Sequence, residues 1–133
     1  MATTDSYRLL IDQAAALSVA QPLTRQVTAG YAGAALLAVD GRVYTGRSLT
    51  GNCGVAFCAE VGAVLTMLKS GTSQITALAT VSNDHRLMPP CGRCREMLFQ
   101  LHRENLHTVV VLDDALVTLA ELLPMRWQEL WND

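Results

Sequence analysis

Three cysteines and one glutamate are the residues of this chain with the clearest chemical capability. Residues 58–60 form a Cys-x-Glu motif, and residues 90–94 form a Pro-Cys-x-x-Cys motif. Thiolates bind Zn²⁺, which takes four ligands in tetrahedral geometry. Three protein ligands leave the fourth position to water, which distinguishes a catalytic zinc from a structural one. The two motifs therefore predict a catalytic zinc centre with Cys58, Cys91 and Cys94 as its ligands.

Glu60 supplies the acid–base group that such a centre needs. It lies two residues beyond Cys58, so its side chain can extend beside the metal toward the bound water. A carboxylate in that place can accept the proton of the water and return it to the reacting molecule. Hydrophobic neighbours raise the pKa of a carboxyl group, and Val55, Phe57 and Val61 surround this one in the sequence.

The positions of the cysteines favour the thiolate form. Cys91 and Cys94 are three residues apart at the start of a predicted helix, so their sulfurs share one face. Cys58 begins a second predicted helix, and helix N-termini stabilise negative charge. Three thiolates on one Zn²⁺ leave a net charge of −1, and we expect Arg93 and Arg95 to compensate it.

Two other interpretations of the cysteines remain open. A redox Cys-x-x-Cys pair would leave Cys58 and Glu60 without a role. A structural zinc would need a fourth ligand, for which the sequence offers Cys53, His85, His102 or His107. Each motif is only moderately specific alone, and the presence of both favours the catalytic zinc.

The composition narrows the class of protein further. The chain has 133 residues, of which 50% are hydrophobic and 17% charged, which predicts one domain over residues 1–133. The formal net charge is −2 and no run of Lys or Arg occurs, so we expect no nucleic-acid partner. No apolar stretch is long enough to span a bilayer. Acidic residues precede the apolar stretch at 14–20, which argues against a signal peptide, and four cysteines are then expected to stay reduced in the cytoplasm.

The hydrophobic pattern predicts helices that alternate with strands. We expect strands over residues 32–39, 42–45, 75–82 and 107–112, with a hairpin turn at Asp40-Gly41 and loops over 46–57 and 83–90. Helices are expected over 6–19, from Cys58 to a stop at Gly71, and over 91–104. A capping box at 118–121 predicts a short final helix that ends at Pro124. The alternation predicts an α/β fold with one mixed sheet and helices on both faces.

Several segments resemble the small cytidine deaminase family, whose zinc deaminase pattern the two motifs match. The matching segments cover most of residues 32–124 in order: 33–36, 40–46, 58–60, 90–95 and 122–124. The resemblance implies a three-layer α/β/α sandwich with a five-stranded mixed sheet, and usually a homotetramer. It also implies Zn²⁺-dependent hydrolytic removal of the 4-amino group of a free cytosine nucleoside, with release of ammonia. Glu60 is then the proton shuttle, and the expected substrate contacts are Ala59, Ser48, Thr50, Asn52, Phe57 and Pro90.

The chain departs from the family pattern where relatives hold the sugar. Relatives that use cytidine usually carry Asn-x-Glu after the strand-ending glycine, and these positions here hold Ser48 and Thr50, with Asn52 as a substitute. The usual Arg after Cys-Ala-Glu is Val61, and the usual Gln after the second motif is Glu96. Blasticidin S deaminases share the first two departures. One hypothesis is therefore that cytidine and deoxycytidine are poor substrates and that a nucleoside analogue is better. The alternative is that Asn52 and a neighbouring chain hold the ribose, so that cytidine is a normal substrate.

Two alternatives to a cytidine or deoxycytidine deaminase follow. One is a deaminase of a modified nucleoside such as blasticidin S, or of another aminated heterocycle. The other is a non-catalytic zinc-binding assembly module, but a structural zinc would have no use for the acid–base group of Glu60.

Overall fold

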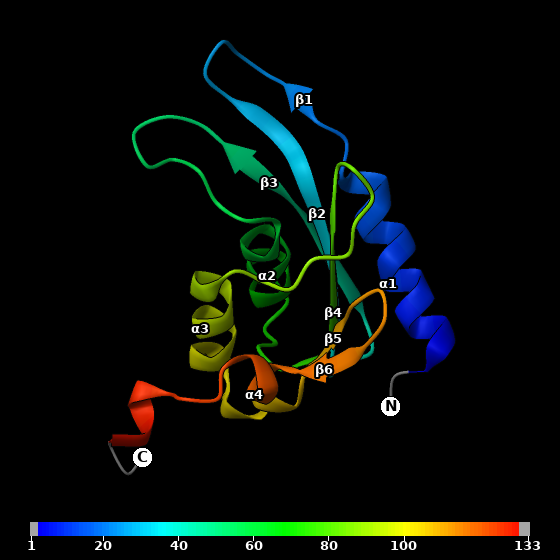
Figure 1. Ribbon diagram of the computed structural model, residues 1–133, viewed down its shortest axis with the longest axis vertical. Coiled ribbons are helices and arrows are strands. Elements are labelled where there is room, and N and C mark those ends of the chain that lie inside the picture. The colour runs from blue at the N-terminus through cyan, green and yellow to red at the C-terminus, as the bar shows by residue number, and fades with distance from the viewer. Residues whose placement is uncertain (1–2, 131–133) are drawn as a thin grey trace.

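The computed structural model describes residues 3–130, which form a sheet with helices on both faces (Figure 1). The helices are α1 (Thr4–Leu17), α2 (Ala59–Lys69), α3 (Gly92–Leu101) and α4 (Leu119–Leu122), with 3₁₀ turns at Arg103–His107 and Trp127–Leu130. The strands are β1 (Gln21–Pro22), β2 (Thr28–Ala38), β3 (Val43–Thr50), β4 (Ile75–Ser82), β5 (Val109–Val111) and β6 (Leu116–Thr118). In the described part of the chain no helix has both the length and the apolar character to cross a membrane.

The sheet is mixed, as predicted. Its five main strands lie in the order β3-β2-β4-β5-β6, and all neighbours are antiparallel except the parallel pair β4 and β5. The two-residue strand β1 pairs with the start of β2 and makes the sheet six-stranded. The expectation of five strands thus describes the main sheet, and the short β1 is the addition.

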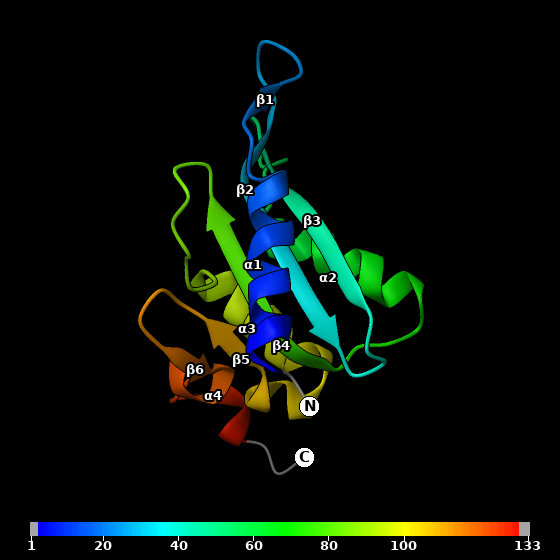
Figure 2. The ribbon, with the colours of Figure 1, turned by 90° about the vertical axis from the view of Figure 1, so that its right-hand side faces the viewer.

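Alternate residues of the strands face two different helical layers. Ala34, Leu36 and Ala38 of β2 pack against α2, α3 and α4 in one core cluster. Ala35, with Ala77 and Ala79 of β4, packs beneath α1 in the other cluster. Figure 2 shows α1 lying alone across its face of the sheet. The α/β/α sandwich is therefore confirmed.

The contact between α2 and β3 is close because a glycine permits it. A Cβ atom added at Gly46 would lie 2.3 Å from the backbone nitrogen of Ala63, which is far inside van der Waals contact. Gly46 lies within β3, although a glycine at this position of the sequence suggested the start of a loop. Its missing side chain allows α2 to approach the strand. This contact fixes the N-terminus of α2 against the sheet.

Several predicted boundaries were wrong, for reasons of tertiary pairing. Residues 46–50 belong to β3 instead of a loop, because the strand continues along β2 as far as the pair Thr28 and Thr50. Strand β6 was missed because it is only three residues long and is recognised by its pairing with β5. The capping box is confirmed: the Thr118 side chain accepts from the Glu121 N–H, and Glu121 accepts from the Thr118 N–H.

Candidate active site

The N-termini of two neighbouring helices bring three thiols together. Cys58 is the N-cap residue of α2 and Cys91 is the N-cap residue of α3, with Cys94 in the first turn of α3. Neither N-cap side chain makes a capping hydrogen bond of normal geometry, although the Cys94 N–H lies close enough to the Cys91 sulfur to lower the pKa of that thiol. The sulfurs of Cys58 and Cys91 are 3.4 Å apart, and all three lie within 4.8 Å of one another.

This spacing fits a zinc ion. Three sulfurs at about 2.3 Å from a tetrahedral Zn²⁺ are about 3.8 Å from one another. Among residues 3–130 no fourth cysteine, histidine or carboxylate joins the cluster. The alternative of a structural zinc with Cys53, His85, His102 or His107 as its fourth ligand is therefore not favoured.

The protonation of the thiols is set by burial and by their neighbours. Burial raises the pKa of Cys58 and that of Cys94, which is fully buried, and nearby Glu60 acts in the same direction. Burial also opposes ionisation of Cys91, but hydrogen bonds from the Cys94 N–H and from the Cys58 thiol lower its pKa overall. Three thiolates this close repel one another, so a bound cation is needed to hold all three in the charged form.

The two arginines expected to supply compensating charge have different surroundings. The Arg93 side chain lines the cavity beside the thiols. Arg95 instead donates to two backbone oxygens, from Nε to Pro90 at 2.8 Å and from a terminal nitrogen to Leu122 at 3.2 Å. Arg95 thus ties the start of α3 to the end of α4 and does not line the cavity.

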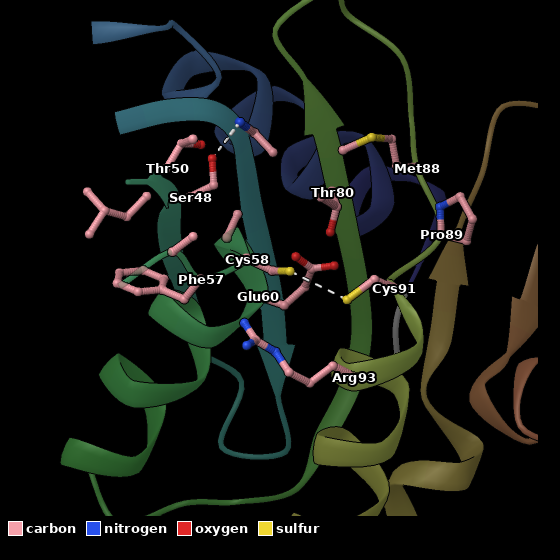
Figure 3. A pocket seen from close by; sticks show the side chains of 14 residues that line it. Ser48, Thr50, Phe57, Cys58, Glu60, Thr80, Met88, Pro89, Cys91 and Arg93 are labelled. Atoms are coloured by element: carbon pink, nitrogen blue, oxygen red, sulfur yellow. Dashed lines mark hydrogen bonds between the residues drawn. The ribbon is translucent and has the colours of Figure 1, made fainter. Parts of the chain in front are cut away.

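Glu60 lies beside the thiols in the first turn of α2. Its residue is only 4% exposed, and burial raises the pKa of its carboxyl group. Its own backbone N–H and the hydroxyl of Thr80 act in the opposite direction. Figure 3 shows the carboxylate between the sulfurs and Thr80. A buried carboxyl group with a raised pKa is suited to exchanging protons near neutral pH.

A cavity of about 450 Å³ opens above these groups, which is within the usual size range of small-molecule sites. Of the expected substrate contacts, Ser48, Thr50, Phe57 and Ala59 line it. Asn52 and Pro90 do not: Asn52 lies exposed in the loop beyond β3, and Pro90 is fully buried beneath the cavity. Several further residues line the cavity that no sequence motif indicated, namely Ala32, Leu49, Ala56, Thr80, Met88 and Pro89.

Ser48 has a role that its sequence position did not reveal. Its hydroxyl oxygen accepts a hydrogen bond from the Ala32 N–H at 2.9 Å. Strand β2 bulges between Ala29 and Gly33, where its register with β3 shifts. The Ala32 N–H lies within this bulge, and the Ser48 hydroxyl satisfies it. The hydroxyl still has its own proton to donate into the cavity.

The fold and the site together bring three possible metal ligands and a buried carboxyl group to one open cavity. No family model matches the chain. A cytidine deaminase from Halalkalibacterium halodurans is 36% identical over 98 residues, which are 69% of this chain and 73% of that protein. A cytidine deaminase from Mycobacterium tuberculosis is 39% identical over 69 residues, so the aligned part spans only 52% of that relative.

Solved structures agree with these relatives. The crystal structure of cytidine deaminase from Mycobacterium tuberculosis has a TM-score of 0.74 at 30% identity, over 91% of this chain and 96% of that chain. That of the enzyme from Burkholderia pseudomallei has a TM-score of 0.70 at 27% identity, over 91% of this chain and 98% of that chain. The chain belongs to the cytidine deaminase family, as its resemblance implied.

Proposed function

We propose that this chain is a zinc-dependent aminohydrolase that removes the 4-amino group of cytidine or deoxycytidine and releases ammonia. The observation that carries the proposal is the buried carboxylate of Glu60 beside three clustered thiols, in a member of a family whose named relatives are cytidine deaminases. The non-catalytic alternative gives this carboxylate no use.

Cys58, Cys91 and Cys94 are the residues that would hold the metal. Bound there, Zn²⁺ would supply Lewis acidity and would lower the pKa of water enough for attack at neutral pH. Arg93, at the wall of the cavity, makes no ion pair within residues 3–130 and can offset the charge of the thiolates.

Glu60 would move the protons. Its carboxylate would accept one proton from the attacking water and donate it to the ring nitrogen, and would then accept the second proton from the added hydroxyl group and donate it to the departing amine. The burial that raises its pKa favours the protonated form that the second half of the reaction needs.

The walls of the cavity would hold the nucleoside. Phe57, Met88 and Pro89 present apolar surface suited to a flat base, and Ala59 lies at the start of α2 beside the thiols. Ser48 and Thr50 offer hydroxyls nearer the end of β3, where we place the sugar. A base seated in the cavity would displace water from the surface of these apolar side chains.

The decisive experiment follows ammonia release by purified, zinc-loaded protein. The panel contains cytidine, deoxycytidine, cytosine, blasticidin S and adenosine, and uridine formation is measured in parallel. We expect turnover of cytidine or deoxycytidine at micromolar enzyme. Turnover of blasticidin S alone would show that the substrate is this modified nucleoside and not cytidine. No turnover of any compound by the zinc-loaded protein would contradict the proposal.

We further propose that residues 1–133 form one domain, that the chain acts in the cytoplasm, and that it assembles as a homotetramer. The support is the family resemblance for the assembly and the composition for the other two. Light scattering at working concentration measures the assembly, and a fully active monomer would contradict it.

A further inference from the structure

Thr80 is a buried hydroxyl at the cavity that completes no hydrogen bond of normal geometry within residues 3–130. The residue is 3% exposed, and the one polar group that its Oγ1 atom influences is the Glu60 carboxylate, whose pKa it lowers. Only one other buried side-chain atom in the described chain shares this condition, Oε1 of Gln128, and that residue lies outside the cavity.

The apolar surroundings of Thr80 mean that burial of its hydroxyl lowers the stability of the fold. It lies on β4, directly opposite Ala34 of β2, and its chain neighbours Ala79 and Val81 are buried and apolar. Valine has the same shape, forms strands equally well and buries no polar atom. A buried hydroxyl without a partner loses its hydrogen bonds to water and gains none in return. The fold alone therefore gives no reason for threonine here.

The direction of the side chain gives a reason. In Figure 3 the Thr80 hydroxyl points from β4 toward the carboxylate of Glu60, with Cys91 and Met88 beside it. The cavity is lined by Ala32 of β2, by Ser48 of β3 and by Thr80 of β4, and β2 lies between the other two strands. A molecule that fills the cavity down to Glu60 must meet this hydroxyl.

We propose that Thr80 is a substrate contact, which hydrogen-bonds to the edge of the base that reacts. The proposal rests on the proposed deamination and names one further residue for it. Deamination replaces an amine, which donates, with a carbonyl, which accepts. A hydroxyl can accept from the first and donate to the second, whereas an ionised carboxylate only accepts. Thr80 therefore suits both the substrate and the product.

Three variants test the contact. Thr80→Val keeps the shape and removes the hydroxyl, Thr80→Ser keeps the hydroxyl, and Thr108→Val is the matched control. Thr108 is also fully buried, but its hydroxyl donates to the Ile75 carbonyl at 2.9 Å and lies outside the cavity. The measurements are kcat/KM for cytidine, the Kd of uridine by calorimetry, and Tm.

We expect Thr80→Val to lower kcat/KM and to weaken uridine binding, each by roughly two- to tenfold, with a Tm at least as high as that of the wild type. Thr80→Ser should return kcat/KM to within about twofold of the wild type, because it restores the hydroxyl. Thr108→Val should show the reverse pattern, with a lower Tm and unchanged kcat/KM.

The outcomes separate this contact from the proposed function. If Thr80→Val leaves the Kd of uridine unchanged, Thr80 is not a substrate contact, even where the wild type deaminates cytidine. If Thr80→Val lowers Tm as Thr108→Val does, the hydroxyl belongs to the fold and the proposal is overturned. If the wild type binds uridine but releases no ammonia, the proposed function fails, and weaker binding by Thr80→Val still supports the contact.

Discussion

The cavity has a floor and a rim that are built differently. The floor consists of Cys58, Glu60, Thr80, Cys91 and Cys94, and the rim of Ser48, Thr50 and Phe57. Floor residues lie in the first turns of α2 and α3 and in the central strand β4. Rim residues lie where β3 runs beyond the helices, toward the loop that leads into α2 (Figure 1).

The two regions are also held with different firmness. Glu60 is 4% exposed and Cys94 is fully buried, and the close contact of α2 with Gly46 fixes the helix that carries Glu60. Thr50 is exposed, and the loop after it returns to the sheet through the two backbone hydrogen bonds between Leu49 and Phe57. The comparison indicates that the groups proposed for the chemistry are firmly packed, while the proposed contacts to the sugar lie on a lightly supported wall.

The largest effect should come from removing a buried thiol of the floor. Cys94→Ser replaces a fully buried, proposed zinc ligand, and the remaining two thiols cannot complete a three-thiolate site. Elemental analysis should give one zinc per wild-type chain and almost none for the variant, with deaminase activity lost.

Cys53→Ser is the matched control for this loss. Cys53 is exposed in the loop after β3 and lies outside the three-sulfur cluster. It should keep both zinc and activity. Zinc retained at full occupancy in Cys94→Ser would show that the floor is not built around these three thiols.

A smaller but still severe effect is expected for Glu60→Gln. The amide cannot accept the proton of the attacking water, and loss of a general acid–base group typically costs about 10²–10⁴-fold in rate. Zinc content and Tm should stay close to those of the wild type, because the amide has the same shape.

The exposed variant Glu104→Gln serves as the control, since Glu104 pairs only with His107 at the surface. It should be fully active. A Glu60→Gln protein with more than about a tenth of the wild-type rate, a loss of less than about 1.4 kcal/mol, would assign the proton transfers to another group.

The sequence predicted all three rim residues and four of the five floor residues, and it missed Thr80. The motifs at Cys58 and Cys91 each start a helix, so the local spacing already places the ligands on helix N-termini. Thr80 escaped because a threonine within an apolar strand has no local mark of function. Its position at the cavity follows only from the tertiary arrangement, in which β4 lies between β2 and β5 and the Thr80 side chain points toward Glu60.

The rim depends on a feature that no local pattern reveals. Strand β2 bulges after Ala29, where Gly30 adopts a φ of 88°. Within the bulge, the Ala32 N–H donates to the Ser48 hydroxyl instead of to a backbone carbonyl of β3. Counting from Gly46 identified Ser48 and Thr50 as lining residues but also placed Asn52 there, which the structure does not support.

Ser48→Ala tests the rim through the stability of the fold, because it should lower the free energy of unfolding. Removal of the hydroxyl leaves the Ala32 N–H without its partner in a part-buried place, which costs about 1–3 kcal/mol of unfolding free energy. Urea unfolding measures the change. Ser73→Ala is the control, because the Ser73 hydroxyl makes no hydrogen bond within residues 3–130. Equal stability of the two variants would mean that the bulge does not need Ser48.

Thr50→Ala should have the smallest effect and bears directly on how the sugar is read. Its hydroxyl is neutral and its residue exposed, so a contact with a sugar hydroxyl is worth about 0.5–1.5 kcal/mol at most. We expect kcat/KM for cytidine to fall by roughly two- to tenfold, mainly through KM. Thr66→Ala removes an exposed hydroxyl that bonds only to the Gly62 carbonyl on α2, away from the cavity, and should leave the kinetics unchanged. A loss above a hundredfold in Thr50→Ala would show that the rim recognises the sugar as firmly as the floor holds its metal, and the distinction between the two regions would then fail.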